Sequence, residues 1–277
     1  MNKKLLWIVS VVITFVGTSM AIDFMGPPTA GLKEGQWKIG YTYHHSENDL
    51  LVDYSKYYVN GVKYKIDLED VEIDDIKVTR NYVTFNYGLA DDRMEIYGFL
   101  GAADTESGTF SGIGEDVKFS GDQDFAFGVG TKVTTNIYDN VDWGILAQAS
   151  WIRSSDTVQS FSGTYEGHTY SGKYDVEFDA VEIQVAAGPT IKIRKDWKVY
   201  GGVVGYWLYG DLEEKISGTV DGTPAGSLKL CGDLKQDSAF GGYIGTQIDL
   251  FKNAAIAAEY ANTGDSEGFG VNVSWKF

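Results

Sequence analysis

The feature that most constrains this chain is an alternation of apolar and polar residues with a period of two. In the last nine residues, from Phe269 to Phe277, the odd positions are Phe, Val, Val, Trp and Phe, and the even positions are Gly, Asn, Ser and Lys. Successive side chains of a β-strand point to opposite faces of a sheet, so this pattern gives one apolar and one polar face. We therefore expect an all-β chain.

The same alternation recurs along the chain and predicts an antiparallel β-barrel of about ten strands, with eight or twelve as alternatives. The predicted ranges are 36–46, 78–89, 93–103, 124–136, 143–153, 177–193, 197–210, 238–251, 254–262 and 267–277. Short polar turns alternate with long connections, which are 47–76, 104–123, 154–176 and 211–237. Within them, Asn60-Gly61 is a strong hairpin signal and Glu166-Gly167 and Asp221-Gly222 are weaker ones, so we expect some strands to extend beyond the bilayer as exposed hairpins. This asymmetry is typical of transmembrane barrels, with the short turns on the periplasmic side.

The N-terminus has the parts of a secretory signal peptide, which we place at residues 1–21. Lys3 and Lys4 precede an apolar run from Leu5 to Val16, and Ser19-Met20-Ala21 is a small-x-small cleavage site. A retained N-terminal anchor is the alternative. Residues 22–35 show no period, and we expect a periplasmic segment that lies across the barrel mouth or is disordered. The barrel itself is predicted over residues 36–277.

Charges within the polar faces favour a membrane barrel over a soluble one. A dry core would have to pair every buried charge, whereas a polar lumen accepts them. The residues predicted to line the lumen are Lys38, Glu95, Lys132, Glu182, Lys192 and Glu259. The opposite faces end in aromatic residues, whose rings favour the level of the lipid headgroups. The predicted aromatic girdle consists of Trp37, Tyr41, Tyr43, Tyr87, Trp143, Trp151 and Trp275.

The end of the chain resembles the C-terminal signal of bacterial outer-membrane β-barrel proteins. These proteins end in an aromatic residue that follows apolar residues at every second position, and Val273, Trp275 and Phe277 stand at such places. The resemblance implies a protein exported through a cleaved signal peptide into the cell outer membrane. It also implies recognition by the barrel-assembly machinery and contact with outer-membrane lipid and lipopolysaccharide. The residues leave the oligomeric state open.

The composition is strongly acidic. The formal net charge is -16, and removal of Lys3 and Lys4 changes it to -18. Such a chain is a poor partner for nucleic acid, because phosphates repel it. The four long connections hold 23 acidic and 8 basic residues, so we expect most of the negative charge on the outer side. The densest run, Asp67–Asp75, lacks the spacing of a calcium loop, which favours a solvated surface over a metal site.

The inward charges leave two functions open. They form either a hydrogen-bonded plug that stiffens a narrow barrel or the lining of a narrow pore. We therefore expect a porin-like narrow channel or a structural surface barrel, with no catalytic residue, metal or cofactor. The alternative is an outer-membrane protease or lipid hydrolase with its site at the extracellular rim. There His44 would form a base–carboxylate pair with Asp49 or Asp53.

Overall fold

The computed structural model describes residues 23–107, 119–120, 124–165, 168–236, 239–264 and 266–277. Over these residues the chain forms β-strands joined by turns. Within the same ranges, no helix is long and apolar enough to cross a membrane. The predicted signal peptide, residues 1–21, lies outside the described residues.

The described part of the chain contains twelve strands, and every pairing between them is antiparallel. Their bounds are β1 (Trp37–Val59), β2 (Val62–Ala90), β3 (Met94–Ser107), β4 (Phe119–Ser120), β5 (Asp124–Tyr138), β6 (Val141–Tyr165), β7 (His168–Arg194), β8 (Trp197–Val220), β9 (Thr223–Lys235), β10 (Phe240–Asp249), β11 (Ala254–Asn262) and β12 (Ser266–Lys276).

Ten of these strands close a ring. The order is β1, β2, β3, β5, β6, β7, β8, β10, β11 and β12, and β12 pairs again with β1 between Lys38↔Lys276 and Asn48↔Ser266. Closure satisfies the backbone of every strand through its neighbours, which hydrocarbon requires of a spanning sheet. The prediction of an antiparallel barrel of about ten strands is confirmed.

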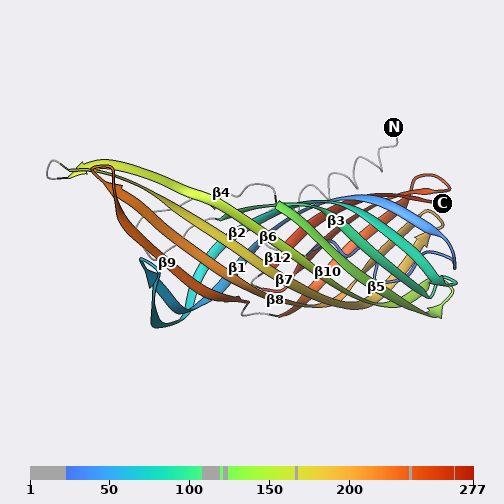
Figure 1. The fold of residues 1–277 in the computed structure, drawn as a ribbon. Coiled ribbons are helices and arrows are strands. Elements are labelled where there is room, and N and C mark those ends of the chain that lie inside the picture. Colours follow the sequence, from blue (N-terminus) through green and yellow to red (C-terminus); the bar gives the residue numbers. More distant parts are fainter. Residues whose placement is uncertain (1–22, 108–118, 121–123, 166–167, 237–238, 265) are drawn as a thin grey trace, which may run out of the picture.

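Five strands continue beyond the ring. β1, β2, β6, β7 and β8 have 23, 29, 25, 27 and 24 residues, more than twice the roughly 9–11 residues of a membrane-spanning strand. β9 joins them, because it pairs with β8 on one side and with β1 on the other. We call this part the extension; it comprises residues 49–76, 154–165, 168–180 and 209–235. In Figure 1 it points to the left, and the short turns lie at the right with the C-terminus.

The extension confirms that some strands continue beyond the bilayer as hairpins, and it corrects the treatment of residues 47–76, 154–176 and 211–237 as long connections. Where the structure describes these residues, they are mostly strand, with tight turns at Asn60–Gly61 and Asp221–Gly222. The predicted turn at Glu166-Gly167 lies outside the described residues. Asn60 and Gly61 have φ angles of 51° and 82°, and Asp221 and Gly222 have 51° and 75°. Positive φ at both central residues defines the type I′ turn that Asn-Gly favours.

The apolar face of each long strand changes sides between the ring and the extension. On β1, Trp37 and Tyr41 face outward in the ring and are 55% and 52% exposed. Leu50, Val52 and Tyr54 face inward in the extension and are buried. Lipid surrounds the ring and water surrounds the extension, so the apolar residues point outward in one part and inward in the other. The buried apolar residues of the extension include Leu50, Val52, Tyr54, Ile73, Tyr174, Val176, Phe178, Leu212 and Leu234.

Candidate functional site

Residues 23–34 run inside the ring, and we call them the luminal segment. Asp23, Met25 and Leu32 are 1%, 3% and 0% exposed. The segment leaves at the short-turn rim, where Gly35 N donates a hydrogen bond to Gly88 O at 3.0 Å. This corrects the prediction of a periplasmic segment across the mouth. The segment has no period of its own, because its partners lie on strands far away in sequence.

Two carboxylates of the wall bind the main chain of the luminal segment. Met25 N donates to Glu259 Oε1 at 2.9 Å, and Gly31 N donates to Glu95 Oε2 at 3.1 Å. Hydrogen bonds to a charged acceptor are stronger than neutral ones, and a buried N–H left without one would be costly. These two wall residues therefore hold both ends of the segment.

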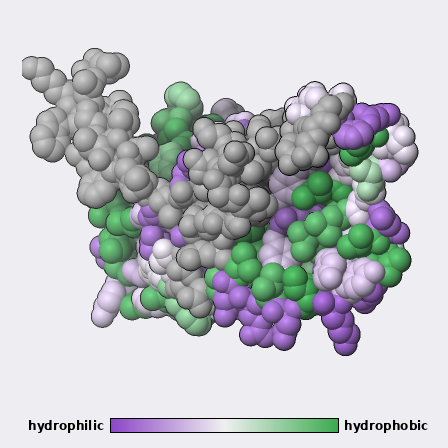
Figure 2. Space-filling view, turned by 90° about the vertical axis from the view of Figure 1, so that its left-hand side faces the viewer, coloured by the Kyte–Doolittle hydropathy of each residue, from purple (hydrophilic) through white to green (hydrophobic). Residues whose placement is uncertain are grey.

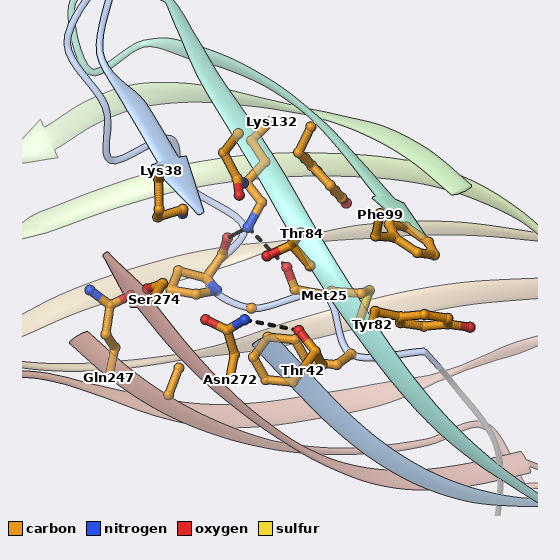
Figure 3. Close-up of a pocket in the computed structure, with 16 residues that line it drawn as sticks. Met25, Lys38, Thr42, Tyr82, Thr84, Phe99, Lys132, Gln247, Asn272 and Ser274 are labelled. Atoms are coloured by element: carbon orange, nitrogen blue, oxygen red, sulfur yellow. Dashed lines mark hydrogen bonds between the residues drawn. The ribbon is translucent and has the colours of Figure 1, made fainter. Parts of the chain in front are cut away.

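Two positively charged lysines of the wall bind carbonyl oxygens of the luminal segment. Lys132 Nζ donates to Met25 O at 2.9 Å and to Pro27 O at 2.8 Å (Figure 3). Lys276 Nζ donates to Gly31 O at 3.1 Å. The wall thus recognises carbonyl oxygens of the segment as well as its N–H groups, and this recognition depends little on the segment's side chains.

Glycines in the wall allow the segment to approach closely. A Cβ atom at Gly144 on β6 would lie 2.4 Å from Pro28 O, and one at Gly88 on β2 would lie 2.1 Å from Lys33 O. Both distances are far below van der Waals contact, so neither position accepts a side chain without displacement of the segment.

An ionic cluster lies at the inner end of the luminal segment. Arg80 Nη1 is 2.7 Å from Asp23 Oδ1, and Arg80 Nη2 donates to Glu182. Tyr206 OH and Ser150 Oγ also donate to Glu182, each at 2.9 Å. All five residues are buried. Two carboxylates share one guanidinium, so each buried charge has a partner of opposite sign, which buried charges require.

A second ionic cluster lies nearer the short-turn rim. Glu95 Oε1 accepts hydrogen bonds from Lys38 Nζ at 3.2 Å and from Asn86 Nδ2 at 2.6 Å. Its other oxygen binds Gly31 of the luminal segment. This cluster therefore joins three strands of the ring to the segment.

Cavities of the described part of the barrel lie on either side of the luminal segment. One of about 50 Å³ lies against Met25 and Pro27 and is lined also by Lys38, Thr42 and Asn272 (Figure 3). It is large enough to hold water. The other has about 670 Å³ and lies at the short-turn rim, lined by residues such as Arg93, Asp142 and Lys192. It is a vestibule that ends on the luminal segment.

The structure places the predicted lumen-lining charges as follows. Glu95, Lys132, Glu182 and Glu259 are buried inside the ring. Lys38 is 22% exposed and binds Glu95. Lys192 lies at the short-turn rim, where it is 41% exposed and forms an ion pair with Asp142 at 2.8 Å. The interior therefore brings five of the six residues together around the luminal segment.

The predicted aromatic girdle lies on the outward face. Five of its residues are between 40% and 55% exposed: Trp37, Tyr41, Tyr43, Trp143 and Trp275. Tyr87 and Trp151 are half-buried, and Trp151 Nε1 donates to Asp179 at 2.7 Å. Val273, Trp275 and Phe277 of the predicted assembly signal also face outward on and after β12, at 48%, 45% and 71% exposure. Their contacts with lipid and with the assembly machinery stay predictions.

The histidines do not form the predicted rim site. His44 is 1% exposed and its Nδ1 lies 3.8 Å from Oδ1 of Asp23, not beside Asp49 or Asp53. Asp53 instead accepts hydrogen bonds from Lys235 Nζ at 2.7 Å and from Asp70 N at 2.9 Å. These two bonds hold the pKa of the Asp53 carboxyl below its ordinary value. The prediction that Asp49 or Asp53 orients His44 is wrong.

The spacing Gly264-x-Ser266-x-Gly268 also occurs in serine hydrolases, where the serine lies on a turn between a strand and a helix. Here Ser266 begins β12 and is fully buried. Its hydroxyl binds Asn48 and Gln236. This environment is that of a structural serine. Among the described residues, no group of three or more His, Cys, Asp or Glu is placed to hold a metal ion.

The predicted lumen-lining residues do not include Asp23 and Arg80, the two residues at the centre of the interior. The alternation of the predicted strand 78–89 is enough to place Arg80 inside the barrel, because Arg80 lies on the same face of that strand as the inward residue Asn86. The alternation predicts nothing about Asp23, because this residue precedes the first strand. Only the folded chain shows that a carboxylate from outside the strands neutralises this guanidinium.

Comparisons with known proteins agree on the fold at a very distant level. No protein-family model matches the chain, and no curated protein matches its sequence. An outer membrane channel from Pseudomonas putida F1 aligns with 12% identity and a TM-score of 0.42, over 92% of this chain and 100% of that chain. The outer membrane protease OmpT from Escherichia coli aligns with 10% identity and a TM-score of 0.43, over 92% and 99%. The toluene transporter TbuX from Ralstonia pickettii aligns with 11% identity and a TM-score of 0.40, over 94% and 95%. At these values the likenesses carry no argument about function.

The class of the protein follows from the barrel itself. A closed antiparallel ring with an apolar outward belt, a polar interior, short turns at one rim and long hairpins at the other has the architecture of bacterial outer-membrane barrels. The chain is an integral outer-membrane β-barrel protein of this kind. Barrels of this architecture have their short turns on the periplasmic side.

Proposed function

We propose that this protein is a structural surface barrel that is closed to solutes and holds the β-sheet extension outside the cell. The observation that carries the proposal is the occupied interior. The luminal segment fills the ring from the short-turn rim to Asp23, and the apolar core of the extension continues from there. A channel needs a continuous aqueous path, and neither cavity described above supplies one.

The ion pairs of the interior support the same conclusion. Arg80, Glu182 and Asp23 bind one another, and Glu95 is bound by Lys38. Charges that set ion preference in a pore face water, whereas these face partners within the wall and the luminal segment. Their role in this proposal is to fix the segment and stiffen the ring.

Conductance in planar bilayers tests the closed state. The full chain, refolded in detergent and reconstituted, is expected to give no stepwise current in either polarity, because the interior lacks a continuous path. Insertion is confirmed separately by heat-modifiable migration of the recovered protein on a gel. Steady, reproducible current steps from properly inserted protein would contradict the proposal and restore the narrow-channel alternative.

Epitope tags in the turns test the display of the extension. A tag inserted at the Asn60–Gly61 turn is expected to bind antibody on intact cells, because that turn lies at the far end of the extension. A matched tag at the Lys195–Asp196 turn, at the opposite rim, is expected to bind only after the outer membrane is permeabilised. The reverse result would place the extension in the periplasm.

Under the same proposal, the outward aromatic residues contact lipid and lipopolysaccharide, and Val273, Trp275 and Phe277 serve assembly. Deletion of Phe277 is expected to lower the amount of folded barrel in the outer membrane. The control is Phe251→Ser. Phe251 is an aromatic residue in a short turn, and at 73% exposure it is about as exposed as Phe277. Equal loss in both variants would contradict an assembly role for the terminal residue.

The hydrolase alternative has less support. His44 is buried beneath the apolar core of the extension, where a peptide or lipid substrate would have to displace that core. His168 is exposed and lies beside Asp221 at the far end of the extension. Hydrolytic catalysis needs a positioned nucleophile in addition to a histidine–carboxylate pair.

A further inference from the structure

The outward face of the extension changes its charge with distance from the ring. Close to the ring, four aspartates stand directly beside one another on neighbouring strands: Asp179 pairs with Asp211, Asp211 with Asp233, and Asp233 with Asp53. Farther out, the same face of the same sheet carries lysines. Lys229 lies four residues beyond Asp233 on β9, a separation of roughly 13 Å along an extended strand.

The lysines form a compact group at the far end of the sheet. We call Lys56, Lys63, Lys65, Lys215 and Lys229 the lysine patch. Lys215 on β8 is the cross-strand partner of Lys229 on β9, and Lys56 on β1 is the partner of Lys65 on β2. Lys63, Lys65 and Lys215 are exposed, and Lys56 and Lys229 are half-buried. Figure 2 looks onto this end of the molecule, where hydrophilic and hydrophobic residues lie next to one another.

This arrangement opposes the stability of the sheet. Like charges directly opposite each other on neighbouring strands repel, and the patch contains two such pairs. Lys229 gains some relief from Glu213, whose carboxylate lies 2.5 Å from its Nζ. The hydrogen bond to Glu213 raises the pKa of Lys229, so this lysine stays charged at neutral pH. Asp175 on β7 is the other cross-strand partner of Lys215. The repulsion among the remaining lysines favours a partner that carries negative charge.

An aromatic ring lies in the middle of the patch. Tyr58 on β1 is the cross-strand partner of Lys63 on β2 and of Lys229 on β9. It is half-buried, so part of the side chain remains open to solvent between the ammonium groups. A tyrosine gives a rigid contact surface with an apolar body and a polar end, which suits the faces of sugar rings.

We propose that the lysine patch binds an anionic polysaccharide outside the cell. The ammonium groups would bind carboxylate or sulfate groups of the polymer, and Tyr58 would contact a sugar ring between them. The proposal rests on the proposed function, because the extension must face the exterior. The aspartate row disfavours a stiff nucleic-acid duplex, which would carry phosphates across both the basic and the acidic zones. The distance from the ring disfavours a lipid headgroup of the same membrane.

Binding of heparin, used as a sulfated polysaccharide probe, tests the proposal. The full chain in detergent micelles is titrated at low salt and followed by calorimetry, with neutral dextran as the uncharged comparison. We expect binding of heparin alone, and a loss of affinity as salt rises, because bound counterions are released on association. Substitution of Tyr58 by serine is expected to weaken binding severalfold without changing its salt dependence.

Charge variants locate the site. The variant Lys63→Gln, Lys65→Gln, Lys215→Gln is expected to bind at least tenfold more weakly and with a smaller salt dependence. Its matched control is Arg194→Gln, Lys195→Gln, Lys252→Gln, which removes three charges at the short-turn rim and is expected to bind within twofold of the original chain. Far-ultraviolet circular dichroism and heat-modifiable migration confirm that both variants are folded.

Four results would overturn the proposal. They are the absence of heparin binding by the original chain, unchanged binding by the patch variant, an equal loss in both variants, and binding of duplex DNA as tight as that of heparin. None of them bears on the closed interior or on the side to which the extension projects. Bilayer current or reversed tag exposure would instead contradict the proposed function, so the two failures are distinguishable.

Discussion

Arg80 on β2 forms an ion pair with Asp23 of the luminal segment, with Nη1 and Oδ1 2.7 Å apart and both side chains buried. The contact joins the ring to a residue that belongs to no strand. It also makes the guanidinium the common partner of two carboxylates, because Glu182 accepts a hydrogen bond from Arg80 Nη2. The position of the luminal segment is thus tied to the charges of the wall. Loss of Arg80 would affect the segment, and loss of the segment would leave Arg80 without one of its two carboxylates.

Replacement of Arg80 by methionine is expected to destabilise the barrel strongly. Asp23 and Glu182 would be left buried without their cation, and the loss of one partner of a buried ion pair costs about 3–5 kcal/mol. Arg153→Met is the matched control. Arg153 pairs with Glu177 on the exposed face, at 49% and 42% exposure, and such a pair contributes less than about 1 kcal/mol. Urea unfolding in micelles measures both; equal losses would contradict the central role of Arg80.

Replacement of Gly144 by valine is expected to displace the luminal segment. The added Cβ would meet Pro28 O at 2.4 Å, and overpacking of this kind typically costs about 1–3 kcal/mol. Gly98→Val is the comparison, because a Cβ there would have Gly128 O as its nearest contact at 3.6 Å. Protease sensitivity of the N-terminal residues and thermal unfolding report the effect. A Gly144→Val barrel with the stability of Gly98→Val would argue against a seated segment.

A lysine on the outward face should be tolerated in the extension and rejected in the ring. Val203 and Thr219 lie on the same strand, β8, and Val203 is 67% exposed on the belt. Val203→Lys is expected to destabilise the barrel by up to about 2–4 kcal/mol, because it places a charge against lipid. Thr219→Lys is expected to cost less than about 0.5 kcal/mol, as substitutions in water usually do. Similar losses at both positions in lipid vesicles would contradict the boundary between ring and extension.

Replacement of Asp211 by asparagine is expected to stabilise the extension. Asp211 stands directly between Asp179 and Asp233 in the acidic row, and relief of like-charge repulsion across strands is worth about 0.2–1 kcal/mol for each pair. The gain should shrink when salt is raised, because exposed charges are screened. Hydrogen exchange of β8 and β9 at two salt concentrations measures it. A destabilised variant would show that the row binds a compensating cation.

The bond between Asp53 and Lys235 predicts weakening of the extension in acid. The pKa of Asp53 is lowered from its ordinary 3.8 by Lys235 and by the N–H of Asp70. A carboxyl whose folded pKa is depressed contributes stability above its unfolded pKa and loses that contribution as pH falls through the folded value. The difference in hydrogen exchange between the original chain and Asp53→Asn should therefore be constant above about pH 4, decline as pH falls further, and vanish only below the depressed folded pKa of Asp53. A difference that persists at lower pH would refute the assignment.

The sequence predicted the closed sheet because alternation is a local property. The pattern from Phe269 to Phe277, and its repeats, needs only neighbouring residues to be recognised. The same parity placed Glu95, Lys132, Glu182 and Glu259 inside, and the Asn60–Gly61 pair marked a turn that the structure contains. In each case the side chain and the feature it determines lie within a few residues of one another.

The hairpin signals indicated strands beyond the bilayer, but the length of the extension and its apolar core escaped prediction for a physical reason. Its strands alternate as those of the ring do, but their polar residues face outward, so the connection 47–76 resembled a charged loop. The alternation of a strand does not indicate whether lipid or water surrounds its outward face. It depends on how far the strand rises above the membrane, which the whole ring decides.

The sequence by itself determined that the chain is a sheet, that the sheet has one polar and one apolar face, and roughly where its strands turn, because these follow from residues that are neighbours along the chain. The tertiary structure alone decided that residues 23–34 occupy the lumen, that Asp23 neutralises Arg80, and that lysines from β1, β2, β8 and β9 meet at one place. Those contacts join residues that only ring closure brings together, and no local pattern encodes the closure register.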